Sequence, residues 1–311
     1  TPMELFAERT LLADWPLLSS SLARRQSANR NSLQSAVVGT QSASPKLSII
    51  VPLYGRIDFM EAQIMEFARD SFLCECCEVV YVVDDPPKWQ QAEELARTAC
   101  ALFDFSVRIV GNGTNNGFSG ANNLGVDASS GALLLFLNSD VIPQSPGWLE
   151  MMLETYCAAP DIGAVGARLV FPDGGIQHAG MNFRYDHKFR VWTNAHPSKG
   201  FAPELDTGPT TQDVPAVTGA CLLTSRENLA AIGGWDEGYL IGDFEDSHLC
   251  LALRARGLRI TYDRRAQLVH LERQSFGRVG EPDFRQKVVV ANAARHQTLW
   301  SHLVEIPDTS A

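Results

Sequence analysis

The feature that most constrains the fold is an apolar run, residues 134–137, that ends directly on Asn138, Ser139 and Asp140. A short and wholly apolar run is typical of a strand buried on both faces, as in the parallel sheets of α/β proteins. Open parallel sheets bind ligands beyond the carboxyl ends of their strands. The run therefore places the carboxylate of Asp140 at the predicted ligand-binding edge of a sheet.

Strand and helix patterns alternate through the first half of the chain. The predicted strands are 46–52, 78–83, 106–110 and 134–137, and the predicted helices are 57–72, 89–102 and 119–130. Alternation at this spacing favours parallel pairing with right-handed crossovers. We therefore expect an α/β fold whose Rossmann-like, mostly parallel central sheet carries flanking helices, with a smaller subregion beyond it.

The second half of the chain is less regular. Its predicted strands are 162–171, 258–262 and 267–270, and its predicted helices are 147–158, 227–232, 245–256 and 283–304. Between them, residues 173–213 are polar and show no clear period. A loop of that length inside a domain is usually functional or mobile.

Composition and charge narrow the function classes. The net charge of −10 argues against a protein that binds a nucleic-acid backbone. The 311 residues contain no apolar run long enough to span a membrane and no recognisable signal peptide. Seven cysteines at irregular spacing favour a reducing cytosol. The cluster at 74–77 has no partner Cys or His pair, so ordinary thiols are favoured over zinc.

Residues 1–45 are interpreted as an N-terminal extension or linker, because their second half is rich in Ser, Asn, Gln and Ala. A chain that opens this way is compatible with a section of a longer polypeptide.

Several short motifs occur in a characteristic order. They are Pro52, Asp84-Asp85, the Asn/Gly-rich stretch 116–123, Asn138-Ser139-Asp140, and the segments 218–221, 233–237 and 245–250 followed by His270. Together they resemble the inverting glycosyltransferases of family 2, rhamnosyltransferase-like members in particular, over roughly residues 46–275. The resemblance implies the GT-A fold, with a nucleotide-sugar-binding half (46–145), an acceptor-binding and catalytic half (146–275) and a C-terminal helical tail (276–311).

The resemblance implies a divalent cation held by Asp140 and His270. Transfer from a sugar nucleotide needs the charge of the leaving diphosphate to be stabilised, and a dication does this. The cation is Mn²⁺ or Mg²⁺, and the imidazole ligand favours Mn²⁺ slightly. The Asp-x-Asp signature of the family is reduced to Asn138-Ser139-Asp140, so only its last acid is present. Without the resemblance, Asp140 reads as a strand-end cap and His270 as a core residue.

The resemblance also implies a nucleotide-sugar site beside the cation. Its expected residues are Pro52, Tyr54, Asp84, Asp85, Gly117, Asn123, Asn138 and Ser139. Tyr54 offers a stacking face to a uracil or thymine ring, and Asp85 is the better candidate for the imide N–H, with Asp84 as the alternative. Adjacent acids at a strand end are otherwise merely solvated, and Gly/Asn loops also make plain turns.

An inverting transfer requires a base that accepts the proton of the attacking hydroxyl. The resemblance assigns this role to Asp246, beside Glu245 in the first turn of a helix, where the macrodipole favours ionised carboxylates. Ordinary helix N-terminal acids are the alternative. Trp235, Asp236 and His248 are the expected acceptor-side residues, with core packing as the alternative for Trp235.

These observations predict a metal-assisted, inverting glycosyltransferase. Its donor is a UDP- or dTDP-sugar, and its acceptor is a growing glycan or a lipid-linked saccharide, by resemblance, with residues 173–213 as an acceptor lid. We expect a cytoplasmic protein, with peripheral association at the inner face of the membrane left open. Two rivals are a non-catalytic sugar-nucleotide or glycan-binding module and a sugar nucleotidyltransferase, although residues 52–56 match the triphosphate loop of the latter poorly.

Overall fold

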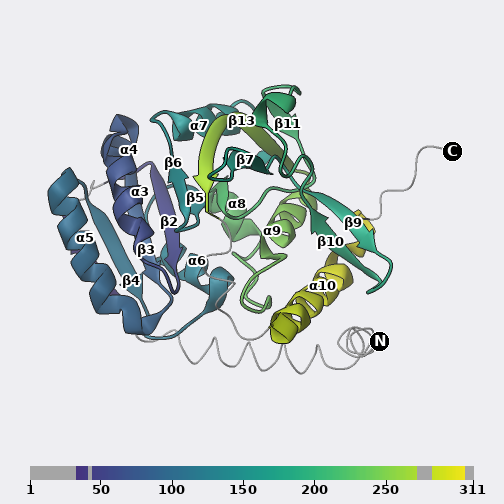
Figure 1. The fold of residues 1–311 in the computed structure, drawn as a ribbon, viewed down its shortest axis with the longest axis horizontal. Coiled ribbons are helices and arrows are strands. Elements are labelled where there is room, and N and C mark those ends of the chain that lie inside the picture. Colours follow the sequence, from purple (N-terminus) through teal and green to yellow (C-terminus); the bar gives the residue numbers. More distant parts are fainter. Residues whose placement is uncertain (1–32, 41–43, 272–281, 305–311) are drawn as a thin grey trace.

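Helices cover both faces of one large sheet in the computed structural model, which describes residues 33–40, 44–271 and 282–304 (Figure 1). The elements are β1 (Gln34–Val38), β2 (Leu47–Leu53), α3 (Phe59–Ala68), α4 (Ser71–Cys76), β3 (Cys77–Val83), η2 (Pro86–Lys88), α5 (Trp89–Phe103), β4 (Val107–Gly111), α6 (Gly117–Asp127), β5 (Leu133–Leu137), β6 (Val141–Pro143), α7 (Trp148–Cys157), β7 (Ile162–Val170), β8 (Ile176–His178), β9 (Asn182–Asp186), β10 (Val191–Ala195), η3 (Pro203–Leu205), β11 (Thr211–Asp213), β12 (Cys221–Ser225), α8 (Arg226–Ala231), α9 (Glu245–Arg254), β13 (Arg259–His270) and α10 (Pro282–Val304).

The sheet has the strand order β1-β4-β3-β2-β5-β12-β7-β13-β11. The four neighbours β4, β3, β2 and β5 are parallel, as predicted. β12 runs antiparallel between β5 and β7, and β13 is parallel to β7. Consequently the carboxyl ends of β2, β3, β5 and β13 and the amino end of β12 share one edge of the sheet, which we call the carboxyl edge.

The core lies in two layers, one on each face of the sheet. In β3 every position is buried, with Val79 and Tyr81 facing the layer of α3, α5 and α7, and Val80 and Val82 facing the layer of α6, α8 and α9. A strand buried on both faces needs apolar side chains at consecutive positions. This explains why the predicted strands are continuous apolar runs.

Three segments differ from the sequence-based interpretation. β1, within the predicted extension, pairs antiparallel with β4, and its mostly exposed side chains gave little apolar signal; residues 1–32 lie outside the described residues. The predicted long loop 173–213 contains β8, the β9–β10 hairpin, η3 and β11. The two strands predicted at 258–262 and 267–270 are one strand, β13. A register shift between Asp263 and Gln267 interrupts its apolar pattern, which is why the sequence predicts two strands.

The predicted C-terminal helix is present as α10, which packs against α9 and the β9–β10 hairpin (Figure 1). Neither α10 nor any other helix among the described residues is long and apolar enough to cross a membrane.

A buried carboxylate joins three segments at the amino ends of the parallel strands. Glu78, 4% exposed at the second position of β3, accepts hydrogen bonds from Ser48 Oγ at 2.7 Å and from Ser130 N at 2.6 Å. Gly131 N donates to the same oxygen at 3.3 Å. Removal of this acceptor would take a partner from the buried hydroxyl of Ser48 and from the amide of Ser130, while Gly131 N would keep its hydrogen bond to Ser48 Oγ.

We expect Glu78→Ala to lower the free energy of unfolding by about 1–3 kcal/mol, because Ser48 Oγ and Ser130 N lose their acceptor. Urea denaturation followed by circular dichroism measures this change. Glu75→Ala, at an exposed position of α4, is the matched control and should change stability by less than about 0.5 kcal/mol. Equal stability of the two variants would contradict the role given to Glu78.

Candidate functional site

The turn that follows β5 carries the predicted metal ligand and is fixed by a buried amide. Gln63, fully buried on α3, donates from Nε2 to the carbonyls of Asn138 and Val141, both at 2.9 Å. Tyr81 donates its hydroxyl to Gln63 Oε1 at 3.2 Å, which orients the amide. The turn therefore presents Asp140 from a rigid support. Sequence reasoning missed Gln63, although a polar residue on the apolar face of a helix was a signal for it.

Strand pairing brings the two predicted metal ligands together. β6 pairs antiparallel with the end of β13, so that Val141 lies opposite His270. His270 Nε2 is 3.3 Å from Asp140 Oδ1, and the two residues are 6% and 7% exposed. On its other side, His270 Nδ1 is 3.2 Å from Oε1 of buried Gln177 in β8. In the tautomer that donates Nδ1–H to Gln177 Oε1, the lone pair of Nε2 faces Asp140.

This arrangement fits a divalent cation that is shared with a ligand. A carboxylate oxygen and an imidazole nitrogen that face each other are both satisfied by a cation between them. Asn138 Oδ1, in the same turn as buried Ser139, is buried without a partner among the described residues. In the described part of the chain no group of three or more His, Cys, Asp or Glu side chains could hold a metal ion. The remaining ligands would be phosphate oxygens and water, the usual arrangement for Mg²⁺-like ions.

Asp84 supports the neighbouring loop rather than facing outward. It is 4% exposed at the end of β3, and it accepts from Asn116 N at 2.6 Å and from Gly117 N at 3.0 Å. Burial raises the pKa of Asp84 to about 7, although the hydrogen bonds from Asn116 and Gly117 oppose that shift. Asp84 thus fixes the amino end of α6, where Gly117 has a φ of +72°.

Asp85 is the acid that joins the two strand ends expected to bind the base. Its Oδ2 accepts from Gly55 N at 3.3 Å, so the loop after β2 and the end of β3 lie side by side. Tyr54, in the loop after β2, and Pro52, within β2, are half-buried. The carboxylate of Asp84 is therefore engaged by the α6 loop, and that of Asp85 by the loop after β2.

Asn123 and Trp235 are hydrogen-bonded to each other within the protein. Asn123 Oδ1 accepts from Trp235 N at 2.9 Å, and its Nδ2 donates to Trp235 O at 2.9 Å and to Glu237 Oε1 at 2.8 Å. Its amide is therefore occupied within the protein. Trp235 is 2% exposed and packs edge-on against Phe118 and Phe136. Trp235 thus packs in the core, the alternative that the sequence left open for it, and the side chain of Asn123 holds its backbone.

Backbone hydrogen bonds link Asp246, the predicted base, to the turn that carries Asp140. Asp246 Oδ2 accepts from Gly219 N at 3.1 Å, and its Oδ1 accepts from Ser247 N at 2.7 Å. The neighbouring residue Ala220 accepts from Asn138 N at 2.9 Å. A backbone bridge of two residues therefore connects the turn of Asp140 with the carboxylate of Asp246. A side chain at Gly219 would collide with Trp235, since an added Cβ would lie 2.9 Å from its ring.

The two adjacent acids at the start of α9 differ in their electrostatics. Burial raises the pKa of Asp246 to about 6, while the amides of Gly219 and Ser247 act against that shift. Glu245 is 7% exposed, and burial together with the nearby carboxylates of Asp246 and Asp243 raises its pKa well above its usual range. Burial thus disfavours the ionised form of Glu245, whereas two backbone amides stabilise the ionised form of Asp246.

The other predicted acceptor-side residues contact α10. Asp236 binds the guanidinium of Arg295 through both oxygens, at 2.7–2.9 Å. His248 Nδ1 accepts from Trp300 Nε1 at 2.9 Å, and burial lowers the pKa of His248 to about 4, so it is neutral at physiological pH. Sequence reasoning did not connect the C-terminal helix with the site, because nothing in its pattern indicates what it packs against.

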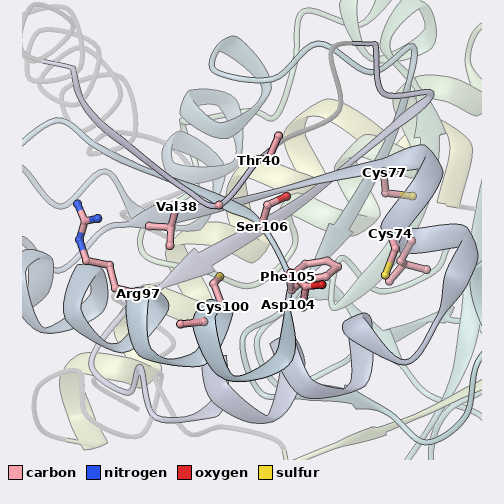
Figure 2. Close-up of a pocket in the computed structure, with 12 residues that line it drawn as sticks. Val38, Thr40, Cys74, Cys77, Arg97, Cys100, Asp104, Phe105 and Ser106 are labelled. Carbon is pink, nitrogen blue, oxygen red and sulfur yellow. The ribbon is translucent and has the colours of Figure 1, made fainter.

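A cavity of about 500 Å³ lies elsewhere, at the amino ends of β3 and β4 (Figure 2). Its lining includes Arg97 and Cys100 of α5 together with Cys74 and Cys77, and these thiols are free. Burial raises the pKa of Cys77 and of Cys100, which makes their thiols poor nucleophiles. The cavity is at the edge opposite to the carboxyl edge and is separate from the site described above.

The family model for glycosyl transferase family 2 matches residues 48–230. An uncharacterized protein, y4gI, of Sinorhizobium fredii is 34% identical over 248 residues, which are 78% of this chain and 26% of that protein. The O-antigen biosynthesis protein RfbC of Myxococcus xanthus is 31% identical over 270 residues, which are 83% of this chain and 20% of that protein. The chain thus spans about a quarter or less of the length of these relatives.

Two solved structures show the same fold at low identity. GalNAc-T7, crystallised with UDP, GalNAc and Mn²⁺, superposes with a TM-score of 0.60 and 16% identity over 80% of this chain and 48% of that one. The mannosyltransferase PcManGT from Pyrobaculum calidifontis, in complex with GDP-Man and Mn²⁺, superposes with a TM-score of 0.54 and 16% identity. The superposition covers 94% of this chain and 81% of that one. The chain therefore belongs to glycosyl transferase family 2, and its fold is that of the GT-A glycosyltransferases.

Proposed function

We propose that this chain transfers a sugar from a UDP- or dTDP-sugar to a saccharide hydroxyl with inversion, and that Asp246 is the base. The observation that carries the proposal is the bridge from the turn of Asp140, through Ala220 and Gly219, to Asp246. This bridge supports the proposal because it links the carboxylate of Asp246 to the turn that carries Asp140, and a single displacement requires a proton acceptor at the site of transfer. A glycan or lipid-linked saccharide is the proposed acceptor, in keeping with the O-antigen relative.

In the proposed reaction one oxygen of Asp246 accepts the proton of the acceptor hydroxyl. The hydroxyl oxygen forms a bond to the anomeric carbon, and the bond from that carbon to the diphosphate oxygen breaks on the opposite face. The nucleoside diphosphate leaves with both electrons of that bond. Gly219 and Ser247 hold the carboxylate of Asp246 in place through their N–H groups. A divalent cation, when bound by Asp140 and His270, neutralises the charge of the leaving diphosphate.

The choice of a uracil or thymine nucleotide rests on Tyr54 and Asp85, which we propose as the residues that bind the base. A carboxylate there is suited to an imide N–H, which uracil and thymine both present. Of the two structural relatives, one was solved with UDP and the other with GDP-Man, so the shared fold does not select the base. GDP-Man therefore belongs in any donor screen.

Asp140→Ala should abolish metal-dependent release of the nucleoside diphosphate. We expect wild-type chain to release UDP or dTDP from the matching sugar nucleotide with Mn²⁺ or Mg²⁺ and not with EDTA, and the variant to be at least about 100-fold slower. A coupled assay for free diphosphate measures the rate for UDP-, dTDP- and GDP-sugars. Tight binding of UDP and Mn²⁺ by calorimetry, with no release from any donor, would instead favour a non-catalytic binding module.

The rate should fall in acid because Asp246 must be ionised to accept a proton. Its pKa is raised to about 6, so the ionised fraction decreases as the pH drops through that value. We expect kcat for diphosphate release to be constant above about pH 7 and to fall about tenfold per pH unit well below pH 6. Asp246→Asn should lose about 10²–10⁴-fold in kcat and show no such acid limb. Mn²⁺ is kept saturating at each pH, and an unchanged acid limb in the variant would contradict the assignment.

Gln177→Leu should weaken Mn²⁺ binding by about 10–100-fold, because His270 loses the acceptor that orients its ring. Titration calorimetry or electron paramagnetic resonance of Mn²⁺ in the presence of UDP measures the dissociation constant without any turnover. Gln177→Glu keeps an acceptor at the same place and should bind far more tightly than the Leu variant. Wild-type affinity in Gln177→Leu would show that His270 needs no such support.

A further inference from the structure

The loop that leads into α9 has an unusual backbone. Ile241, Asp243 and Phe244 all have positive φ angles, of 64°, 81° and 75°. Residues other than glycine rarely adopt a positive φ, and this conformation persists only where the surrounding structure imposes it. The next residue is Glu245, the first of α9, followed by Asp246. The direction in which the proposed base points therefore depends on what holds residues 240–244.

One amide of α10 holds this loop. Asn292 is fully buried, and its Oδ1 accepts from Leu240 N at 2.8 Å. Its Nδ2 donates to the carbonyls of Leu240 at 3.0 Å, Gly242 at 2.7 Å and Asp243 at 3.2 Å. Buried backbone groups that are not paired within helices or strands need such partners. A single side chain thus satisfies four backbone groups in the segment of positive φ.

The loop 240–244 also contacts the start of α6, in the nucleotide-sugar-binding half of the chain. Ile241 O accepts from Phe118 N at 3.2 Å, and Gly117 lies next to Ile241, since a Cβ added to Gly117 would be in ordinary contact with the Ile241 carbonyl oxygen at 3.6 Å. Asp84 in turn holds Gly117. The loop is therefore fixed between the start of α6, which belongs to the nucleotide half, and Asn292 on α10.

Two further contacts keep α10 in position without involving Asn292. Arg295, about one turn further along the helix, binds Asp236. Trp300, two turns beyond Asn292, donates to His248. The helix is therefore docked by several independent interactions, and the loss of the Asn292 amide should leave it in place.

We propose that Asn292 is a positioning residue for the transfer reaction, fixing the loop 240–244 so that Asp246 faces the acceptor hydroxyl. The inference rests on the proposed function of Asp246. It extends the site to α10, which lies beyond residues 48–230 matched by the family model. Asn292 itself touches neither nucleotide nor metal ligands among its described contacts, so nucleotide binding should be independent of it.

The test compares Asn292→Leu and Asn292→Asp with Gln297→Leu. Gln297, on the same helix, accepts from Trp192 N at 3.2 Å and does not contact the loop, so it is the matched control. We expect both Asn292 variants to lower kcat for Mn²⁺-dependent diphosphate release at least about tenfold. The KM for the sugar nucleotide and the Kd for UDP should stay within about twofold of wild type, because the nucleotide half is intact. Gln297→Leu should leave kcat unchanged.

Hydrogen exchange gives a readout that does not depend on turnover. In wild type and Gln297→Leu the amide of Leu240 should be protected, and in Asn292→Leu the peptide covering residues 236–249 should exchange faster. Asn292→Asp keeps the acceptor for Leu240 N and nearly the same shape, which guards against a misfolded Leu variant. Wild-type kcat in a folded Asn292 variant would overturn the proposal, as would unchanged exchange of the loop.

The two proposals fail in different ways. If the wild-type chain releases no diphosphate from any donor, the proposed function fails, and exchange of the peptide 236–249 still decides whether Asn292 holds the loop. Suppose that wild type is active and that the Asn292 variants show a raised KM, a lowered kcat and weaker UDP binding together. Asn292 then supports the whole domain and does not position Asp246.

Discussion

The parallel pairing of β2 with β3 and β5 is the constraint on which the rest of the site is built. Because these strands end at one edge, Tyr54, Asp85 and Asp140 are delivered to the same place from segments far apart in the chain. The antiparallel insertion of β12 then brings Gly219 to that edge, and the pairing of β6 with β13 brings His270. A sheet without this mixed pairing would separate the proposed base from the proposed metal ligands.

Burial, more than local sequence, distinguishes the acids of the site from one another. Asp84 accepts two backbone N–H groups and still has a raised pKa, because it lies behind the loop that it supports. Glu245 and Asp246 are adjacent in sequence, yet Asp246 accepts from the backbone of Gly219 while Glu245 Oε2 is buried without a partner among the described residues. The helix macrodipole acts on both, so it cannot separate their roles. Differences in solvation and hydrogen bonding distinguish the two acids instead.

The sequence predicted the sheet and the order of the motifs well, because both depend on local patterns. Apolar runs ending in polar residues identified β2, β3 and β5, and the helical period identified α10. Side-chain roles that depend on distant contacts were predicted less well. Asn123 and Trp235 were expected at the ligand, but the Asn123 amide pairs with the backbone of Trp235, and the Trp235 ring fills the core. Gln63 and Gln177 were missed because their partners, Asn138 and His270, lie 75 and 93 residues away.

The position of α10 suggests why this helix is part of the working unit and not a simple tail. A loop with three residues at positive φ is unfavourable on its own, so its conformation must be maintained by contacts made after the chain has folded around it. The start of α6 provides one such contact and the amide of Asn292 provides four. Since α6 also carries the loop fixed by Asp84, the nucleotide half and α10 hold the same five residues from opposite sides. A chain cut before α10 would lose the amide of Asn292 and with it the support that this helix gives to the loop leading into α9.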